Sequence, residues 1–564
     1  MTHSSTDSTT GRFWWLVAAC ALAVSVVHVA HNEISLRVFN RFTWTTRDFA
    51  WMAPIAYLIL LSLLGVIVMP FKRARDTIIC AFAAWSLLLL LTTIHPLATI
   101  ALSLGVGRAL AWLWSRASIR HLRWTAAASL ALLACAVLVT RAPTAQAGTA
   151  PPNDAPNILL LILDTVAAKR MSLYGYHRET TPRLQELARE SIVFDNAFAA
   201  STWSLPSHAA MFTGLLPHEQ GTSYMQPMRD DARTIVQVLS ERGYATGGFT
   251  ANVGYTGHQT GLARGFEHFE DFTRSLSTML LTTTFSQTDA VRLARRNLDD
   301  GYVRGAVFAF TPRNLRLIGV RSLPNRPAAD IVQRFQRWRS TIKGRPFFAF
   351  INFMEAHSPY EPPEPFRSRY GTSTADRYDG AVAYLDSVVG SLLQTLPPNT
   401  IVAITADHGE QWGEKGFTGH GNTLYLPVLR VPLLVYLPQR TRLRVPQPIS
   451  LRDLPVTLLD VSHIPNNDFP GESLREIWER GKSIVVYAEA TQGKNVPPTN
   501  QTYSGPLRSV LDSAGHYIRF GNGKEEFYTW PNDLDELNNL AGKPEYEPKV
   551  RQYRTLFDSF FPSR

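Results

Sequence analysis

Long apolar runs fill the first quarter of the chain, and shorter apolar runs recur through the rest of it. The long runs lie near residues 13–31, 50–69, 77–94, 97–114 and 124–140. Each is close to the roughly 20 residues that a helix needs to cross the hydrocarbon core of a bilayer. His95 and Pro96 separate the third run from the fourth, and a proline there favours a turn over one long helix. The pattern predicts a transmembrane region of about five helices over residues 1–141.

The basic residues of the short loops predict the orientation of these helices, because Lys and Arg accumulate on the cytoplasmic side. Two loops each carry a basic cluster: Lys72, Arg73 and Arg75, then Arg116, Arg120 and Arg123. If both loops are cytoplasmic and the chain crosses the membrane five times, the amino terminus lies inside and the residues after 141 lie outside the cytoplasm. We expect a multi-pass protein of the plasma (inner) membrane with a periplasmic or extracellular C-terminal part. The arginines within 37–47 fit this arrangement less well, and four crossings would place the C-terminal part in the cytoplasm.

The remainder of the chain alternates short apolar runs with amphipathic stretches. A proline-rich linker at 142–155 precedes apolar runs at 157–163, 245–250, 347–353, 400–405 and 431–437, with helical stretches between them, including 182–190 and 379–396. This alternation predicts a catalytic α/β domain over residues 156–480, with a mostly parallel sheet covered by helices on both faces. From about residue 483 short runs separated by turn residues predict a small antiparallel sheet subdomain over residues 481–564.

Charge and cysteine content narrow the classes of partner and chemistry. Residues 291–345 contain 13 Lys and Arg against three Asp, so this element accounts for the net charge of +10. It is either a solvated amphipathic helix in an insertion or a surface for anionic lipid head groups or an anionic polymer. A nucleic acid partner is excluded for a domain outside the cell. All three cysteines lie in the predicted membrane helices, so the soluble part has no thiolate metal site or cysteine nucleophile.

Metal-binding side chains follow two of the predicted strands. Asp164 comes directly after 157–163, and Asp407 with His408 comes after 400–405. Ligand-binding groups of open parallel sheets gather beyond the carboxyl ends of their strands, so we expect these three side chains to meet. The sequence therefore predicts one divalent metal ion (Zn, Mn, Mg or Ca). Two carboxylates and an imidazole favour zinc or manganese over calcium.

Ser204, in TWSLPSH, is the candidate nucleophile. Pro206 and the residues after it read as the first turn of a helix, where a proline is tolerated. Ser204 would then lie at a helix amino end, where exposed N–H groups favour an anionic phosphate or sulfate. Thr202 is the alternative nucleophile. A cation beside the serine oxygen would lower its proton affinity.

Several polar residues on other loops are candidates for the rim of the same site. His357 follows the strand at 347–353, and His420 ends the glycine-rich loop that begins at Gly409. Two imidazoles at one sheet edge can donate to a tetrahedral anion or protonate a leaving group. Further candidates for substrate contacts are His208, Asn252 and Thr165.

The ordered motifs resemble the sulfatase family of the alkaline phosphatase superfamily. They are PNILLLILDT, the block from YGYHRETTPRL to SLPSHAAMFTG, GFEHFEDF, HSPYEPP, TADHGE with GHG, and FYTWPNDLDELNNLA. The resemblance covers about residues 156–564. It implies an α/β domain followed by a small sheet domain. It also implies metal ligands at Asp164, Asp407 and His408, a nucleophile at Ser204, and substrate-binding or acid groups at His357 and His420.

The chain departs from the common sulfatase pattern at several of these positions. Common sulfatases oxidise a cysteine or serine to formylglycine within a motif that ends in arginine, whereas His208 stands at that last position here. Thr165 replaces an acidic ligand, and His408 replaces an asparagine. The family's KWH block is absent around residues 250–252. These differences resemble a membrane-anchored branch that includes lipoteichoic acid synthases and phosphoethanolamine transferases, which carry an unmodified hydroxyl nucleophile.

The sequence therefore predicts a membrane-anchored, metal-dependent hydrolase of sulfate or phosphate esters that acts outside the cytoplasm through Ser204. Its partners would be the lipid bilayer and an anionic ester, with a lipid head group or an envelope glycan as candidates. One alternative is a phosphotransferase that moves a phosphoglycerol or phosphoethanolamine head group to a glycan or lipid. An alternative of another class is a non-catalytic membrane protein that binds an anionic polymer through residues 291–345.

Overall fold

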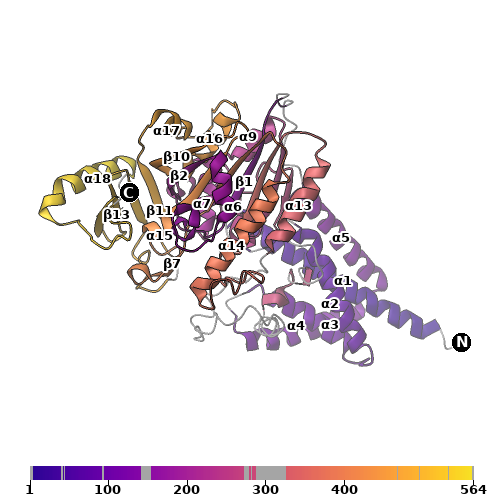
Figure 1. Cartoon of the computed structure of the whole chain (residues 1–564). Helices are drawn as coiled ribbons and strands as arrows, with labels where there is room; N and C mark the ends of the chain where they lie inside the picture. Colours follow the sequence, from indigo (N-terminus) through magenta and orange to yellow (C-terminus); the bar gives the residue numbers. More distant parts are fainter. Residues whose placement is uncertain are drawn as a thin grey trace. The chain divides into compact units, whose positions relative to one another are not determined.

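The chain forms two compact units in its computed structural model. The structure describes residues 4–39, 42–43, 45–46, 48–91, 94–141, 151, 154–271, 279–280, 282–287, 326–466, 468–493, 496–530 and 532–561. The first unit, here called the membrane unit, contains the described residues within 1–143 and 272–307. The second, the catalytic unit, contains those within 144–271 and 308–564. Figure 1 shows the elements of both units along the chain.

The membrane unit contains a helix at each of the five predicted stretches. They are α1 (Ser4–Arg37), α2 (Phe49–Val68), α3 (Arg75–Leu88), α4 (Pro96–Arg116) and α5 (Ile119–Arg141). Four of them, all except α3, are long and apolar enough to cross a membrane. The α3 helix has 14 residues and spans only about 21 Å, so it is shorter than the third predicted stretch, and the number of membrane crossings stays a prediction.

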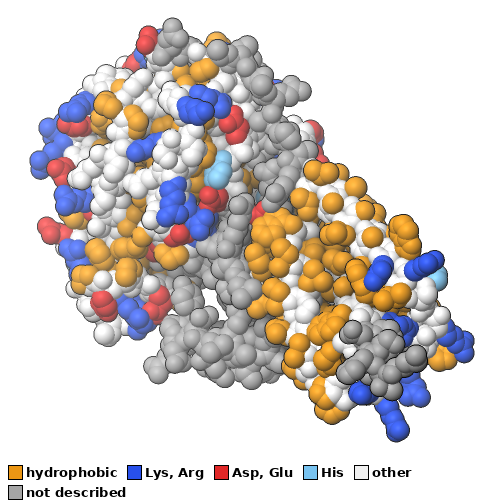
Figure 2. Space-filling view, turned by 90° about the vertical axis from the view of Figure 1, so that its right-hand side faces the viewer, with side chains coloured by type: hydrophobic (Ala, Val, Ile, Leu, Met, Phe, Trp, Pro, Cys, Tyr) orange, Lys and Arg blue, Asp and Glu red, His pale blue; other side chains and the backbone are white. Residues whose placement is uncertain are grey.

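Hydrophobic side chains face outward from these helices, as Figure 2 shows for one side of the molecule. Exposed large hydrophobic residues include Leu63, Ile67, Leu97, Leu104, Leu113, Trp124 and Leu138. An exposed apolar surface of this extent marks a protein or membrane contact rather than a water-facing surface. The four apolar helices therefore have the length and surface that a membrane anchor requires.

One end of the membrane unit brings the two predicted inner loops together. Arg12, near the start of α1, donates to the carbonyl oxygen of Ala117 between α4 and α5 at 3.4 Å. Arg75, at the start of α3, donates to the carbonyl oxygen of Thr9 at 3.4 Å. The helices α1, α3 and α5 therefore all begin at this basic end, and α5 finishes at the opposite end.

The catalytic unit is built on an eight-stranded mixed sheet with the order β10-β2-β9-β6-β1-β5-β3-β4. Its strands are β1 (Asn157–Leu163), β2 (Ser191–Phe198), β3 (Ala245–Thr250), β4 (His268–Glu270), β5 (Phe347–Phe353), β6 (Thr400–Thr405), β9 (Arg430–Tyr436) and β10 (Leu443–Ser450). The β1 strand pairs in parallel with β5 and β6, with Leu160 opposite Phe350 and Ala403. Only β9 runs against its neighbours β6 and β2. The carboxyl ends of β1, β3, β4, β5 and β6 thus share one edge.

Helices cover both faces of this sheet. Successive residues of a strand point to opposite faces, and residues 158–163 of β1 are all buried. The principal helices are α6 (Pro182–Leu187), α7 (Ser204–Thr213), α9 (Ile235–Glu241), α13 (Ala328–Thr341), α14 (Thr374–Leu393) and α16 (Leu454–Val461). Shorter ones are α8 (Pro217–Gln220), α10 (Val253–Thr256), α15 (Leu426–Leu429) and α17 (Arg475–Arg480). The predicted α/β class is confirmed, although β2, β4 and β10 were missed.

A small antiparallel sheet follows, as predicted. Its strands are β11 (Val486–Ala490), β12 (Leu507–Leu511), β13 (Gly515–Arg519) and β14 (Glu525–Thr529), and they pair in chain order. The α18 helix (Glu547–Phe560) buries Val550, Tyr553 and Phe557, which share an apolar core with Val510 and Phe527 of the sheet. The predicted domain limits, including the boundary at residues 480 and 481, stay predictions.

The described part of the predicted basic element packs on the sheet and forms ion pairs within the catalytic unit. Residues 291–325 lie outside the described residues, whereas α13 covers the sheet with Ile331, Phe335 and Trp338 buried. Arg334 pairs with Asp330 at 2.9 Å and with Glu270 at 3.0 Å. Over this part of the element, the ordinary amphipathic helix is the better interpretation.

Candidate active site

Asp164 stands directly after β1, at the carboxyl edge of the large sheet. Its side chain is fully buried. One carboxylate oxygen, Oδ2, accepts hydrogen bonds from Asn252 Nδ2 at 2.8 Å and from Asn352 Nδ2 at 3.2 Å. The other oxygen, Oδ1, is buried without a hydrogen-bond partner among the described residues. Leaving a buried carboxylate oxygen unpaired is costly, so Asp164 presents an open coordination position.

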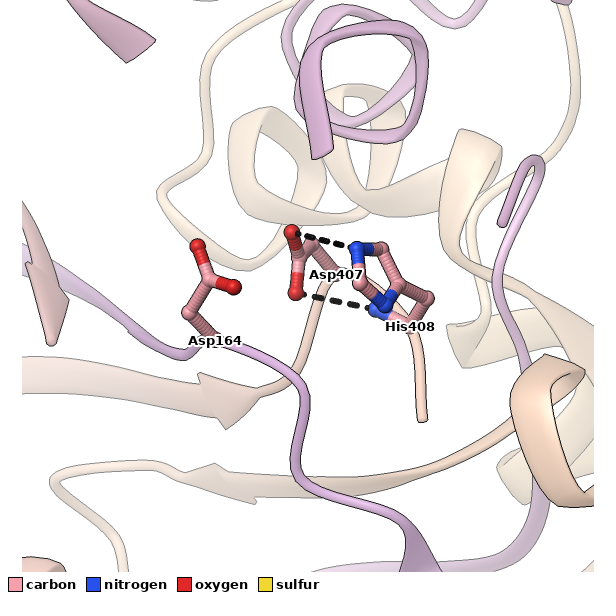
Figure 3. Close-up of side chains that lie close together, drawn as sticks. All are labelled: Asp164, Asp407 and His408. Atoms are coloured by element: carbon pink, nitrogen blue, oxygen red, sulfur yellow. Dashed lines mark hydrogen bonds and ion pairs between the residues drawn. The ribbon is translucent and has the colours of Figure 1, made fainter. Parts of the chain in front are cut away.

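Asp407 and His408 stand after β6, next to Asp164 (Figure 3). Asp407 Oδ1 accepts from the backbone N–H groups of Thr165 at 3.1 Å and His408 at 3.0 Å. Its Oδ2 is buried, has no hydrogen-bond partner in the described part of the chain, and lies 3.4 Å from His408 Nε2. His408 Nδ1 donates to the carbonyl oxygen of Gly409 at 3.1 Å, which leaves the lone pair of Nε2 for a ligand.

These three side chains form a candidate metal site. Each offers one ligand atom, and the three atoms lie within 4.8 Å of one another. Burial, and then the neighbouring His420, lower the pKa of His408 to about 3, so its imidazole is neutral, the form that binds a metal ion. The two unpaired carboxylate oxygens and this nitrogen fit a divalent cation.

Ser204 begins α7 and points its hydroxyl at the same place. Its Oγ lies 3.2 Å from His408 Nε2, and only 2% of the residue is exposed. The residues of α7 from Ser204 to Thr213 are all buried, so packing fixes the position of the hydroxyl. The dipole at the amino end of α7 favours an anion beside Ser204.

A short hairpin places His420 over this group. It consists of β7 (Gln411–Trp412) and β8 (Thr418–Gly419). His420 Nδ1 lies 2.9 Å from Glu410 Oε1, and Glu410 Oε2 accepts a hydrogen bond from the Tyr360 hydroxyl at 2.8 Å. The rings of His420 and His408 have centroids 4.3 Å apart. Burial opposes a charge on His420, but the carboxylates of Glu410, Asp164 and Asp407 together outweigh it and raise the pKa of the imidazole, so His420 is suited to carry a proton.

His357 lies beside His420 on the loop after β5. The centroids of the two rings are 5.2 Å apart, and the imidazole Nδ1 of His357 donates to the carbonyl oxygen of Ser358 at 2.9 Å. The two histidines that were expected at the rim of the site are therefore neighbours, and their predicted substrate and acid roles stay predictions.

The other predicted substrate contacts are used to hold site residues. His208 Nδ1 donates to the carbonyl oxygen of Ser204 at 2.8 Å, and its Nε2 lies 3.4 Å from Asn352 Nδ2. The Thr165 hydroxyl is 2.6 Å from the carbonyl oxygen of Ala356. Asn252 donates to Asp164, as described above. Direct contacts of His208, Asn252 and Thr165 with a substrate stay predictions, because the observed contacts favour positioning roles.

Sequence reasoning missed Asn352 and Glu410. Asn352 is a fully buried residue of β5, and its Oδ1 accepts from the backbone N–H of Asn252 at 2.9 Å. It thereby connects Asp164, Asn252 and His208. The signal was a single amide side chain inside the apolar run FFAFINF. Glu410 follows His408 by two residues, and nothing in its spacing predicted the contact with His420.

Known proteins resemble this chain over its catalytic unit. The sulfatase family model matches residues 156–464, more than half of the chain. The uncharacterized sulfatase YidJ of Escherichia coli K12 is 24% identical over 433 residues, which cover 68% of this chain and 83% of that protein. The Delta 4,5-hexuronate-2-O-sulfatase of Bacteroides thetaiotaomicron is 24% identical over 450 residues, with coverages of 73% and 90%.

A solved structure shares the fold. The phosphonate monoester hydrolase of Agrobacterium radiobacter superimposes with a TM-score of 0.55 at 17% identity, over 72% of this chain and 95% of that one. The matched residues 156–464 contain Asp164, Ser204, Asp407 and His408. The chain therefore belongs to the sulfatase family, within the alkaline phosphatase superfamily of enzymes that hydrolyse sulfate or phosphate esters.

Proposed function

We propose that the chain is a membrane-anchored, metal-dependent hydrolase that attacks sulfate or phosphate esters with an unmodified Ser204. The observation that carries this proposal is the position of the Ser204 hydroxyl, 3.2 Å from His408 Nε2. Beside it lie the two buried carboxylate oxygens of Asp164 and Asp407 that lack a hydrogen-bond partner among the described residues. An alcohol next to such a ligand set has the surroundings that a serine nucleophile requires.

Asp164, Asp407 and His408 would hold the cation, with zinc or manganese favoured by this mixture of oxygen and nitrogen ligands. A cation held by these residues would supply a lower proton affinity at the Ser204 hydroxyl, whose proton would pass to water, and would offset the negative charge of the ester. The protein's own contribution is to orient these groups: Asn252 and Asn352 fix Asp164, and the Gly409 carbonyl fixes the tautomer of His408.

The reaction has two steps. In the first, Ser204 Oγ bonds to the sulfur or phosphorus atom while the bond from that atom to the alcohol oxygen breaks. The leaving oxygen takes a proton from His420 or His357, the two imidazoles on the loops after β6 and β5. In the second step a water molecule hydrolyses the serine ester, which releases sulfate or phosphate and restores the hydroxyl.

The proposed location is outside the cytoplasm, on a multi-pass anchor. The α2–α3 and α4–α5 loops meet at one end of the membrane unit, and their basic residues support a cytoplasmic location of that end. The α5 helix begins there and finishes at the opposite end, so the chain after residue 141 leaves on the outer side even though α3 is short. Labelling of single cysteines at residues 72 and 150 in intact cells tests this, and labelling of residue 72 alone from outside would contradict it.

The activity is tested on the purified full chain with 4-nitrophenyl sulfate and 4-nitrophenyl phosphate. Ser204→Ala and Asp407→Asn should each lower kcat at least about a thousandfold, because the first removes the nucleophile and the second removes a charged ligand of the cation. Ser340→Ala, a serine on the exposed side of α13, is the matched control and should leave kcat unchanged. Full activity of Ser204→Ala would refute the proposal. Appearance of the phosphoryl group on added glycerol instead of water would show transfer.

A further inference from the structure

A second stretch of the chain, inserted between two parts of the catalytic unit's sequence, belongs to the membrane unit. Residues 279–287 follow β4 and precede α13 in the chain, yet they belong to the compact unit of α1–α5. The segment ends in a short 3-10 helix, η5 (Thr284–Gln287). The chain therefore passes from the catalytic unit to the membrane unit and back, in addition to the linker at 142–155.

Polar contacts hold this segment to α2. The Tyr57 hydroxyl of α2 is fully buried, lies 3.1 Å from the Thr284 hydroxyl and accepts the backbone N–H of Thr284 at 3.0 Å. The same hydroxyl lies 3.0 Å from His28 Nδ1 of α1. Buried polar groups among membrane helices need partners, and Thr284 supplies two hydrogen bonds.

Aromatic contacts hold the segment to α3. Phe285 is 8% exposed and belongs to the same apolar core as the membrane helices. Its ring stacks on Phe82, with centroids 4.3 Å apart, and lies 5.1 Å from Trp85. Phe82 and Trp85 belong to the second half of α3, and Tyr57 to the first half of α2. The docking site therefore lies away from the basic end of the membrane unit.

The connection leaves the catalytic unit from the edge that carries the active site. The β4 strand pairs in parallel with β3, so Glu270 ends at the carboxyl edge, where Asp164 also stands. Arg326, at the return of the chain, is 3% exposed and donates to the carbonyl oxygens of Glu270 at 2.8 Å and Thr250 at 3.3 Å. Hydrogen bonds of Arg326 therefore hold together the two points at which the chain leaves and re-enters the catalytic unit, at the edge of the active site.

We propose that residues 282–287 are a second membrane tether that adapts the enzyme to esters carried by bilayer-anchored molecules. From Asp271 to Met279 the chain advances eight residues, which reach at most about 28 Å when fully extended. This limit, set by chain length alone, restricts how far the active-site edge can move from the membrane helices. A tethered site meets a membrane-anchored substrate at a raised effective concentration, whereas a soluble ester gains nothing.

The inference rests on the proposed ester hydrolysis. A pair of matched substrates tests the tether separately from the hydrolysis. Full-length protein in phosphatidylcholine vesicles is assayed with a soluble 4-nitrophenyl ester and with its hexadecanoylamino derivative embedded in the same vesicles. Phe285→Ala combined with Thr284→Val should lower the rate on the embedded ester by about tenfold and leave the rate on the soluble ester within about twofold. Phe71→Ala, at a phenylalanine that is 61% exposed in the same unit, should change neither rate.

Equal losses on both esters would overturn the proposal, and so would no loss on either. Wild-type protein that cleaves neither ester would instead refute the proposed function. A second measurement tests docking itself in a variant without the cysteines at 20, 80 and 135. A maleimide should modify Phe285→Cys at least about tenfold more slowly than Phe71→Cys, because a buried thiol is shielded from the reagent. Equal rates would overturn the proposal even if the activities behaved as expected.

Discussion

Asn352→Leu should weaken metal binding without unfolding the catalytic unit. The substitution keeps the size of the side chain but removes the amide that donates to Asp164 Oδ2 at 3.2 Å and accepts the N–H of Asn252 at 2.9 Å. A hydrogen bond to a charged group contributes about 1.5–3 kcal/mol. Since 1.4 kcal/mol is a factor of ten in an equilibrium constant, the dissociation constant for zinc or manganese should rise by roughly 10- to 100-fold.

The assay is competition between the metal-free full chain and a chromophoric chelator, with Asn399→Leu as the control. Asn399 is an exposed residue of a loop whose amide donates to the carbonyl oxygen of Asp154 at 3.3 Å, so its loss should leave the affinity unchanged. Thermal unfolding of the metal-free proteins shows whether the fold is retained. An affinity of Asn352→Leu equal to that of wild type would refute the reasoning that Asn352 orients Asp164 as a ligand.

Three further predictions concern the loop of His420, a buried carboxyl and the metal. Gly421→Ala should lower both Tm and kcat, because Gly421 has φ +78° and a Cβ there would lie 2.3 Å from Trp203. The control is Gly416→Ala, where φ is +82° but the Cβ would meet open space, so only backbone strain is added. Equal effects of the two substitutions would contradict this. Burial raises the pKa of Asp453 from 3.8 to about 7, so stability falls as pH rises through 7, and Asp453→Asn should gain up to a few kcal/mol over wild type between pH 5 and 8. Thermal unfolding of wild type and Asp453→Asn at pH 5 and at pH 8 measures that gain. A Tm difference between the two proteins that is the same at both pH values would count against it. EDTA should lower Tm, and Zn²⁺ or Mn²⁺ at 100 times its dissociation constant should restore about 2.7 kcal/mol; an unchanged Tm would mean that no structural cation was bound.

The strands that carry the site were predictable because they are buried on both faces. Continuous apolar runs such as 157–163 and 400–405 identify strands of a covered parallel sheet, and β1 and β6 have these same limits in the structure. The edge strand β10 and its neighbour β2 mix polar and apolar residues, including Asn196 and Pro446. Their pairing depends on long-range contacts, which a local pattern does not contain.

The site was predictable only where a functional side chain directly follows a strand or begins a helix. Asp164, Asp407 and Ser204 meet this condition, so their convergence follows from the topology of the sheet. The residues that orient them do not meet it. Asn352 lies within a strand, and the Glu410–His420 contact depends on a hairpin whose turn brings residues ten apart in sequence together. The 14-residue length of α3 was likewise hidden, because apolar residues continue beyond its end.

The complete burial of α7 has a consequence for how this enzyme can diversify. Since no residue from Ser204 to Thr213 faces water, any change along that helix disturbs the packing behind the attacking oxygen. Selection for a larger or differently shaped ester would therefore act on the segments that follow β3, β5 and β6, while the nucleophile itself stays where the core holds it.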